Sequence, residues 1–327
     1  MVKALLQFTF PFKKPEDIQQ ILESCHSIRD FQTRVIYHSV KKVLDRSAEG
    51  FTTSGFEKLK PQTAYLFVSN HRDIILDTSL LNVALYEHDL LMTASAIGDN
   101  LVQKPFLLAL SKLNRNFLIR RGLSPREMLD SSKMASSFIK KLVLEDNRPV
   151  WIAQREGRTK DGNDETQQGV LKMIALASDE DSPMTYFKKL KIVPVSISYE
   201  YDPTDVLKIP ELLAKHYDQE YVKSNNEDFN SILKGATGQK KRIHIAVGDF
   251  MDETLGEIAK SGEPANRQFQ MLADKIDEQV HKNYKLWPSN YIAYDLLNNT
   301  STFSEEYSTK EKRQFERRIE RRVEDGN

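Results

Sequence analysis

The feature that most constrains this chain is the alternation of short apolar runs with helical repeats between residues 65 and 247. Such alternation is typical of strand–helix–strand units, which build a parallel sheet covered by helices. The predicted strands are residues 65–68, 90–94, 116–119, 149–153, 191–199 and 243–247. Pro194 lies inside the fifth of them, which predicts an edge strand or a bulge, because proline lacks the ladder N–H. The pattern therefore predicts an α/β fold with a mainly parallel central sheet flanked by helices.

Apolar residues at helical spacing predict the helices between and around these strands. The predicted helices are residues 78–86, 101–113, 124–145, 167–178 and 264–285. Residues 15–49 are expected to form one long or two short amphipathic helices, and residues 50–62 a turn-rich connection. Residues 202–240 give a weaker, partly helical pattern.

Three units are expected along the chain. Residues 1–58 form an N-terminal arm and helical segment, residues 59–300 an α/β domain, and residues 301–327 a charged helical tail. Ser308 and Glu311 form a capping box at the start of that tail. Its narrow apolar stripe predicts a solvated helix that lies on the body or on a partner.

Composition narrows the class of protein. The 327 residues have a formal net charge of +0, which gives no case for nucleic-acid binding. Cys25 is the single cysteine, which excludes an internal disulfide and a cysteine-rich metal site and fits a reducing cytoplasm. No stretch approaches the roughly 18 to 20 apolar residues that span a bilayer. The apolar residues 1–14 are too short for a signal peptide, which leaves a packed arm, a terminal strand or a membrane-surface anchor.

A histidine with nearby carboxylates lies between the end of a predicted strand and the start of a predicted helix. His71 follows the strand at residues 65–68, and Asp73 and Asp77 follow the histidine. In open α/β sheets, ligands bind at the carboxyl ends of the strands. A neutral imidazole held by a carboxylate is a general base near neutral pH. The alternative is a purely structural histidine–aspartate pair.

Two further polar clusters have the same placement. Arg120 and Arg121 follow the strand at residues 116–119, and residues 156–160 follow the strand at 149–153. A parallel sheet brings the ends of its strands to one edge, so all three clusters are expected to meet. Arginine forks suit phosphate oxygens, and a base beside them suits deprotonation of a hydroxyl on a phosphorylated substrate. The alternatives are a solvated strand end for the arginine pair and an ordinary surface turn for residues 156–160.

A protein kinase is the competing interpretation, because His71-Arg72-Asp73 spells the start of a kinase catalytic loop. That loop needs an asparagine five residues after the aspartate, and Thr78 stands there. It also needs a glycine-rich loop upstream, where this chain has only Gly50 and Gly55. We reject a kinase.

Four blocks in order over residues 65–200 resemble the glycerolipid acyltransferase family, whose members acylate glycerol 3-phosphate or 1-acylglycerol 3-phosphate. The blocks are Asn70-His71-Arg72 with a following aspartate, Phe117-Leu118-Ile119-Arg120-Arg121, Glu156-Gly157-Arg158-Thr159, and Ile192-Val193-Pro194-Val195 with Ser198-Tyr199-Glu200 after it. The second and fourth blocks look closer to the glycerol-3-phosphate branch than to the 1-acylglycerol-3-phosphate branch. The α/β domain would then be an acyltransferase domain.

The first and third blocks depart from the family pattern. Family spacing places the aspartate at position 76, where this chain has Leu76, so either Asp77 or Asp73 serves His71. We expect Asp77, provided that residues 72–75 form an irregular turn and the helix begins only near residue 76 or 77. The third block lacks one residue between Gly157 and Arg158.

The resemblance implies an O-acyltransferase of phospholipid biosynthesis. His71, oriented by Asp77, would deprotonate a glycerol hydroxyl that attacks an acyl thioester. Substrate-binding residues would be Arg120 or Arg121, with Glu156, Gly157, Arg158 and Lys160; Glu156 would contact glycerol hydroxyls or hold Arg158. Acyl-CoA or acyl-ACP would be the co-substrate, with no metal and no further cofactor.

The partners implied are the acyl thioester, the phosphorylated glycerol acceptor and, for an acyl-ACP donor, acyl carrier protein. A basic stretch predicts peripheral contact with anionic lipid, at the inner face of the membrane in the cytoplasm; its members are Lys112, Arg115, Arg120, Arg121 and Arg126. The alternative acceptor is 1-acylglycerol 3-phosphate. The alternative of another class is a non-catalytic lipid- or acyl-binding module with the same fold.

Overall fold

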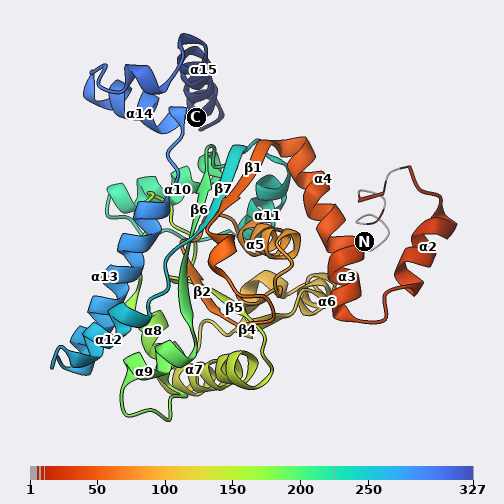
Figure 1. Ribbon diagram of the computed structural model, residues 1–327. Helices are drawn as coiled ribbons and strands as arrows, with labels where there is room; N and C mark the ends of the chain where they lie inside the picture. Colours follow the sequence, from red (N-terminus) through yellow and green to blue (C-terminus); the bar gives the residue numbers. More distant parts are fainter. Residues whose placement is uncertain (1–5, 7–8, 11, 225, 327) are drawn as a thin grey trace.

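The computed structural model describes residues 6, 9–10, 12–224 and 226–326, which contain one seven-stranded sheet in the order β1-β7-β6-β2-β5-β3-β4 (Figure 1). The strands are β1 Ala48–Ser54, β2 Leu66–Ser69, β3 Ala94–Gly98, β4 Asn116–Ile119, β5 Val150–Ala153, β6 Ile192–Tyr199 and β7 Lys241–Val247. Strands β2 to β6 run parallel, whereas β7 is antiparallel to β6 and β1 follows the direction of β7. The predicted α/β class with a mainly parallel sheet is confirmed.

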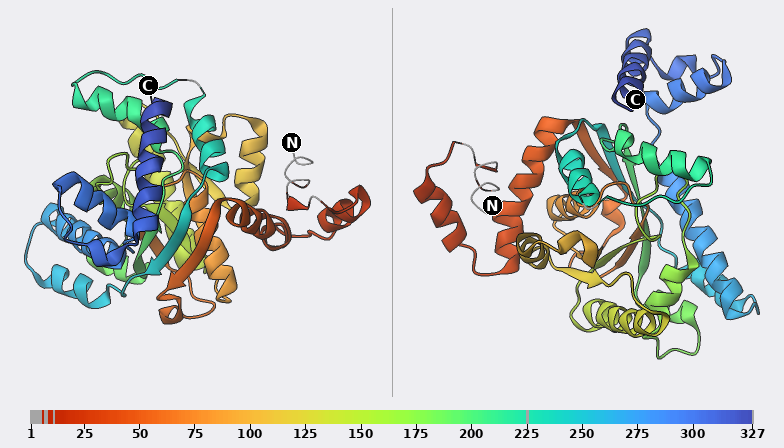
Figure 2. Two further views of the ribbon diagram at one scale, coloured as in Figure 1. Left: turned by 90° about the horizontal axis from the view of Figure 1, so that it is seen from above. Right: turned by 180° about the vertical axis from the view of Figure 1, so that it is seen from behind.

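Helices cover both faces of this sheet (Figure 2). In chain order they are α2 Pro15–Glu23, α3 Ile28–Phe31, a π-helical turn Gln32–Ile36, α4 Tyr37–Ser47, α5 Leu76–Glu87, α6 Pro105–Leu113, α7 Pro125–Lys140 with a π-helical turn Lys141–Glu145, α8 Gln168–Ala175, α9 Pro183–Lys189, α10 Asp205–His216, α11 Glu227–Thr237, α12 Asp252–Lys260, α13 Ala265–Asn283, α14 Pro288–Asn298 and α15 Thr309–Gly326. Short 3₁₀ turns lie at Phe56–Lys58, Asp99–Val102 and Ser304–Glu306.

Alternating side chains of the central strands divide the core into two layers. Val68 and Ile152 point to one face, where they pack with α7, α8, α9, α12 and α13. Phe67 and Trp151 point to the other face, where they pack with α4 and α5. All four are at most 5% exposed. Because successive strand residues face opposite sides, this short apolar run fills both layers.

The prediction that Pro194 makes its strand an edge or a bulge is wrong. Strand β6 is buried along its whole length and lies between β7 and β2. Its pairing with β7 begins only at Val195↔Val247, so Pro194 stands just outside that ladder. The carbonyl of Pro194 still accepts a hydrogen bond from Gly248 N–H at 2.9 Å. The missing proline N–H therefore falls where β7 has already ended, and a central strand tolerates it.

Residues 50–54, which were predicted to belong to a turn-rich connection, are part of strand β1. This strand alternates half-buried and exposed residues and pairs with β7, almost two hundred positions later in the chain. The Thr52 hydroxyl lies 2.8 Å from His244 Nδ1 on β7. A half-exposed edge strand with a glycine and threonines carries little apolar signal of its own. Its identity depends on a distant partner.

Two other boundaries shift. The strand predicted at residues 90–94 overlaps β3 only at Ala94. Leu90 belongs to the turn after α5, where its N–H donates to Leu85 O at 2.8 Å. The helical segment predicted at residues 15–49 is interrupted between α2 and α3. A π-helical turn then joins α3 to α4. Ser124 and Glu127 form a capping box at the start of α7.

Helix α2, near the start of the described residues, and helix α15, near their end, lie far apart on the molecule (Figure 1). Residues 1–5, 7–8 and 11 lie outside the described residues, so the interpretation of the arm at 1–14 falls largely outside them too. Helix α15 rests on the body, where Arg318 and Arg322 pair with Asp205 at the start of α10. In the described part of the chain, no helix has the length and apolar character to cross a membrane.

Candidate functional site

The histidine turn follows the carboxyl end of β2. His71 comes two residues after the strand, and α5 begins only at Leu76. The predicted irregular turn between the histidine and the helix is therefore confirmed. Asn70 fixes its start, because its amide bonds both the N–H (2.8 Å) and the carbonyl (3.0 Å) of Ile197 on β6.

Asp77 is the carboxylate that reaches the imidazole. Its Oδ2 lies 2.8 Å from His71 Nδ1 and also accepts the backbone N–H groups of Arg72 (2.7 Å) and Asp73 (3.0 Å). Its Oδ1 accepts the Tyr199 hydroxyl at 3.0 Å. Asp77 is completely buried, whereas the His71 side chain is 14% exposed. An ionised carboxylate tolerates such burial when its oxygens are hydrogen-bonded, and this one has four donors.

Asp73 has a different task. Its Oδ1 accepts the N–H groups of Ile75 (2.9 Å) and Leu76 (2.8 Å), so it caps the beginning of α5. Burial, and then the Asp77 charge, raise the pKa of the Asp73 carboxyl. Arg72, the residue before it, pairs with Asp164. This cap stabilises the turn between His71 and α5, and the turn places the Asp77 carboxylate next to the imidazole.

The free side of the imidazole faces two cavities. Asp77 occupies Nδ1, which leaves Nε2 available, and Trp151 supports the ring edge-on with centroids 5.5 Å apart. His71 lines both a polar cavity of about 510 Å³ and an apolar groove of about 390 Å³. The histidine therefore lies where the polar cavity meets the apolar groove.

Cationic side chains dominate the polar cavity. They are Arg121, Arg155, Arg158, Lys160, Lys215 and Lys223. Glu156, Asp161, Glu211 and Asp228 are the acidic side chains of the same lining. Several of these ions already hold one another: Lys160 pairs with Glu211, Lys215 with Asp161 and Lys223 with Asp228. The three arginines are the cations of this cavity least committed to carboxylates.

The arginines reach the cavity from two strand ends. Arg121 follows β4 and lies 3.8 Å from Glu156, both side chains being largely exposed. Arg158 follows β5, and its Nη1 donates to the Thr204 hydroxyl at 3.4 Å. Gly157 has φ +73°, a conformation that favours glycine and that turns the chain between Glu156 and Arg158. Glu156 thus approaches Arg121 rather than Arg158.

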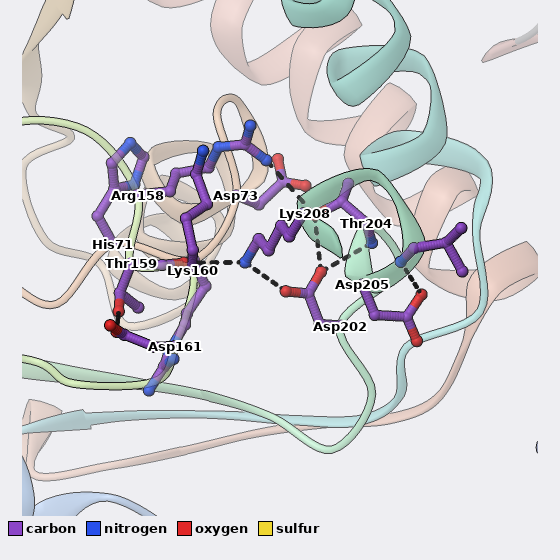
Figure 3. A network of polar contacts seen from close by, with 12 residues as sticks. His71, Asp73, Arg158, Thr159, Lys160, Asp161, Asp202, Thr204, Asp205 and Lys208 are labelled. Carbon is purple, nitrogen blue, oxygen red and sulfur yellow. Dashed lines mark hydrogen bonds and ion pairs between the residues drawn. The ribbon is translucent and has the colours of Figure 1, made fainter. Parts of the chain in front are cut away.

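A buried lysine supports the loop after β5. Figure 3 shows Lys208 between the carbonyl of Thr159, at 3.0 Å, and the carboxylate of Asp202. Burial raises the pKa of the Asp202 carboxyl, but Lys208 and Thr204 outweigh it and the pKa is lowered. Thr159 N–H also donates to His71 O at 3.2 Å. The loop that carries Arg158 is therefore tied both to α10 and to the histidine turn.

The apolar groove runs from His71 between β3, β4, α7 and α8. Its lining includes Ala96, Ile97, Ile119, Met128, Ser132, Ala135, Val170 and Met173. Arg120 lines this groove, while its neighbour Arg121 lines both cavities. Of the two predicted alternatives for a phosphate contact, Arg121 is the one at the polar cavity.

A third, smaller cavity continues the apolar surface in another direction. It has a volume of about 90 Å³ and lies among α4, α5 and α6. It shares Ile74 with both larger cavities and Leu101 likewise. These two side chains form the apolar rim around His71.

Sequence reasoning missed three functional contributors. Tyr199 was part of a matched block, yet its bond to Asp77 joins positions far apart in the chain. Arg155 stood next to a predicted cluster but was not selected, although it lines both cavities. Lys208 lies in the weak region 202–240, where no motif pointed to it. A tyrosine hydroxyl at the end of a strand predicted to lie in the sheet was the available signal for the first.

Within the described residues, no three His, Cys, Asp or Glu side chains are grouped so as to hold a metal ion. The groups that face the cavities are a base, guanidinium ions, ammonium ions and apolar walls. This set can bind an anion and deprotonate a hydroxyl beside it.

Comparison with known proteins gives one family match, for part of the chain. Residues 50–198 match the family described as Acyltransferase. A search of curated protein sequences found no match. Among solved structures, the 1-acyl-sn-glycerophosphate (LPA) acyltransferase PlsC from Thermotoga maritima is similar, with a TM-score of 0.41 and 12% identity over 87% of this chain and 90% of that one.

Proposed function

We propose that this chain, whose residues 50–198 match the acyltransferase family, moves an acyl chain from a thioester to a hydroxyl of glycerol 3-phosphate. The observation that carries the proposal is the His71–Asp77 pair, bonded at 2.8 Å, at the junction of an arginine-lined cavity and an apolar groove. Acyl transfer to a phosphorylated alcohol needs a base, an anion site and an apolar donor site together.

The reaction assigns a role to each part of the site. His71 Nε2 takes the proton of the acceptor hydroxyl as its oxygen attacks the thioester carbonyl. The carbon–sulfur bond then breaks, and the imidazolium returns the proton to the leaving thiolate. Asp77 stays ionised, fixes the tautomer through Nδ1 and stabilises the imidazolium. Acyl-CoA or acyl-ACP supplies the activated carbonyl.

Glycerol 3-phosphate is the acceptor that suits the polar cavity. Guanidinium groups of Arg121 and Arg158, with Arg155 beside them, can hold the phosphate by forked hydrogen bonds. Lys160 and Glu156 complete the wall near Gly157 and can contact the glycerol hydroxyls. A small acceptor with no apolar part fits a lining made mostly of charged side chains.

The second candidate acceptor is 1-acylglycerol 3-phosphate. The small apolar cavity that shares Ile74 and Leu101 with the polar one favours it, because a second acyl chain needs an apolar wall of its own. A non-catalytic acyl-binding module is the candidate of another class. A non-catalytic module does not need a buried carboxylate held by four hydrogen-bond donors beside a histidine, as Asp77 is held here.

We also propose peripheral contact with an anionic membrane through α7. Met128 and Met134 of this helix are 53% and 68% exposed, and Arg126 lies in its first turn. Exposed apolar side chains with nearby cations are typical of surfaces that rest on anionic lipid. The groove beside α7 would then open toward the acyl donor and the lipid product.

The test is transfer of a radiolabelled acyl group from acyl-CoA or acyl-ACP to glycerol 3-phosphate, with 1-acylglycerol 3-phosphate in a parallel reaction. His71→Ala is expected to lower turnover by about 10²- to 10⁴-fold, the usual value of general-base catalysis. Its melting temperature should barely change, because His71 faces the cavities. A folded His71→Ala protein with normal turnover would end the proposal, and faster reaction with the monoacyl acceptor would select the second candidate.

A further inference from the structure

A second group of arginines lies at the other edge of the sheet, away from His71. Arg115 stands directly before β4 and Arg148 shortly before β5, whereas the residues of the histidine site follow strands. Together with Arg29 on α3 they line a cavity of about 310 Å³. Because β4 and β5 belong to the parallel part of the sheet, their beginnings share one edge. Strand β4 thus separates Arg115 from Arg120, and the basic stretch seen in the sequence does not form one patch.

The charges of this cavity are unbalanced. Three guanidinium groups line it, against a single carboxylate, that of the exposed Asp146. Among the residues that the structure describes, ion pairs engage Arg72, Arg121, Arg242, Arg318 and Arg322, but none of these three. Burial, followed by the charges of Arg148 and Arg29, lowers the pKa of Arg115. Like charges held together without a counter-ion cost free energy that a bound anion would recover.

The arginines are held in place by the surrounding structure. Arg115 Nε donates to Gln32 Oε1 at 3.2 Å, and the Gln32 side chain is only 3% exposed. The backbone of Arg148 donates to Leu142 O at 2.7 Å. Its neighbour Asn147 bonds Ala64 N–H at 2.9 Å and Gln62 O at 2.8 Å. Two of the three guanidinium groups therefore extend from backbone that is fixed before any ligand arrives.

We propose that this cavity binds a phosphate dianion, carried either by a small phosphate ester or by a lipid headgroup. Three guanidinium groups against one carboxylate leave two positive charges, which matches a phosphate monoester rather than a single carboxylate. Guanidinium forks also fit tetrahedral phosphate oxygens with paired hydrogen bonds. The site is separate from the one that carries the proposed transfer reaction, and its binding does not require that reaction.

A structural link to the acyltransferase site runs through Gln32. This glutamine and Met92 line both the arginine cavity and the small apolar cavity that reaches Ile74 and Leu101 beside His71. An anion that fixes Arg115 also fixes the glutamine bonded to it. The bound phosphate would therefore order one wall of an apolar space next to the catalytic histidine.

The experiment compares the double variant Arg115→Gln/Arg148→Gln with a matched control, Arg267→Gln/Arg313→Gln, which removes the same charge from two exposed helix positions. Binding of radiolabelled inorganic phosphate is measured by equilibrium dialysis. Flotation is measured with phosphatidylcholine vesicles with and without phosphatidate. Arg158→Gln is placed in every protein so that the polar cavity at His71 contributes little.

We expect the Arg115/Arg148 variant to bind one of the two probes about tenfold more weakly than the control, since charge-assisted hydrogen bonds are lost. Loss in dialysis assigns a free phosphate ester, and loss only in flotation on phosphatidate assigns a lipid headgroup. Equal binding of both probes by variant and control overturns the proposal. Arg148→Gln alone keeps the Arg115–Gln32 bond, so it repeats the test if the double variant does not fold.

Discussion

The polar cavity and the apolar groove share His71, Arg121 and Arg155, yet they are built in different ways. Charged side chains that pair with one another line the cavity, and α10 contributes Glu211 and Lys215 to it. Ordinary core-like residues of β3, β4, α7 and α8 line the groove, and Met128 keeps more than half of its surface exposed. The two compartments meet around the imidazole, at its apolar rim and along the residues that follow β4 and β5.

The difference teaches how one histidine can serve two unlike substrates. An anion is bound by guanidinium groups whose direction matters, so the cavity needs a network that fixes them, such as Lys208 with Thr159 and Asp202. An acyl chain is bound by contact area, so the groove needs space and little direction. Substitutions in the cavity should therefore act on acceptor kinetics, and substitutions in the groove on donor kinetics.

The largest effect is expected at the junction itself. Asp77→Asn should lower turnover by about 10²- to 10⁴-fold with either substrate varied, because the charge that stabilises the imidazolium is lost while the shape remains. Asp73→Asn should keep most of the activity, since an amide oxygen can still cap Ile75 and Leu76. Steady-state rates of both purified variants decide it, and the reverse ranking would assign the pair to Asp73.

The next effect is expected at the arginines of the polar cavity. Arg158→Lys or Arg121→Lys is expected to raise the KM for the phosphorylated acceptor by about tenfold, because lysine is a point charge without the fork. For Arg158→Lys, whose side chain lines the polar cavity and not the groove, the KM for the thioester should stay near its original value. Arg120→Lys, which changes a groove residue, serves as the matched control. An acceptor KM that is unchanged in both Arg158→Lys and Arg121→Lys would remove the phosphate role.

The groove can be blocked without touching the cavity. Ser132→Trp places an indole in the groove from α7, and about 1 to 3 kcal/mol of overpacking should raise the thioester KM by several-fold or more. The acceptor KM should not follow. Ser137→Trp changes an exposed position of the same helix and controls for effects on α7. Equal donor kinetics in the two tryptophan variants would place the donor elsewhere.

The smallest effect is expected at Tyr199, which contacts Asp77 rather than a cavity. Tyr199→Phe removes one hydrogen bond to Asp77 Oδ1, which is worth about 0.5 to 1.5 kcal/mol, so kcat should fall by roughly two- to tenfold. Tyr199 lines neither the polar cavity nor the apolar groove, so the KM values for both substrates should stay near their original values. A rise in either KM with unchanged kcat would contradict a role through Asp77.

Local patterns were sufficient for the frame of the molecule. The apolar runs at 65–68, 116–119 and 149–153 become β2, β4 and β5 with shifts of at most one residue. Because all three strands run parallel, the clusters that follow them meet at one edge, as expected from their shared placement. Strand direction and side-chain alternation are short-range properties, so a single sequence carries them.

What the sequence alone determined is thus the α/β class, the parallel core and the gathering at one edge of His71, the pair Arg120 and Arg121, and residues 156–160. Tertiary structure decided the rest: the central place of β6 despite Pro194, the existence of β1, and the choice of Asp77 over Asp73. Each of those depends on a partner far along the chain, such as β7 for β1 or Tyr199, 122 positions from Asp77. Propensity and spacing describe neighbours in sequence, whereas burial and long-range hydrogen bonds exist only once the chain has folded.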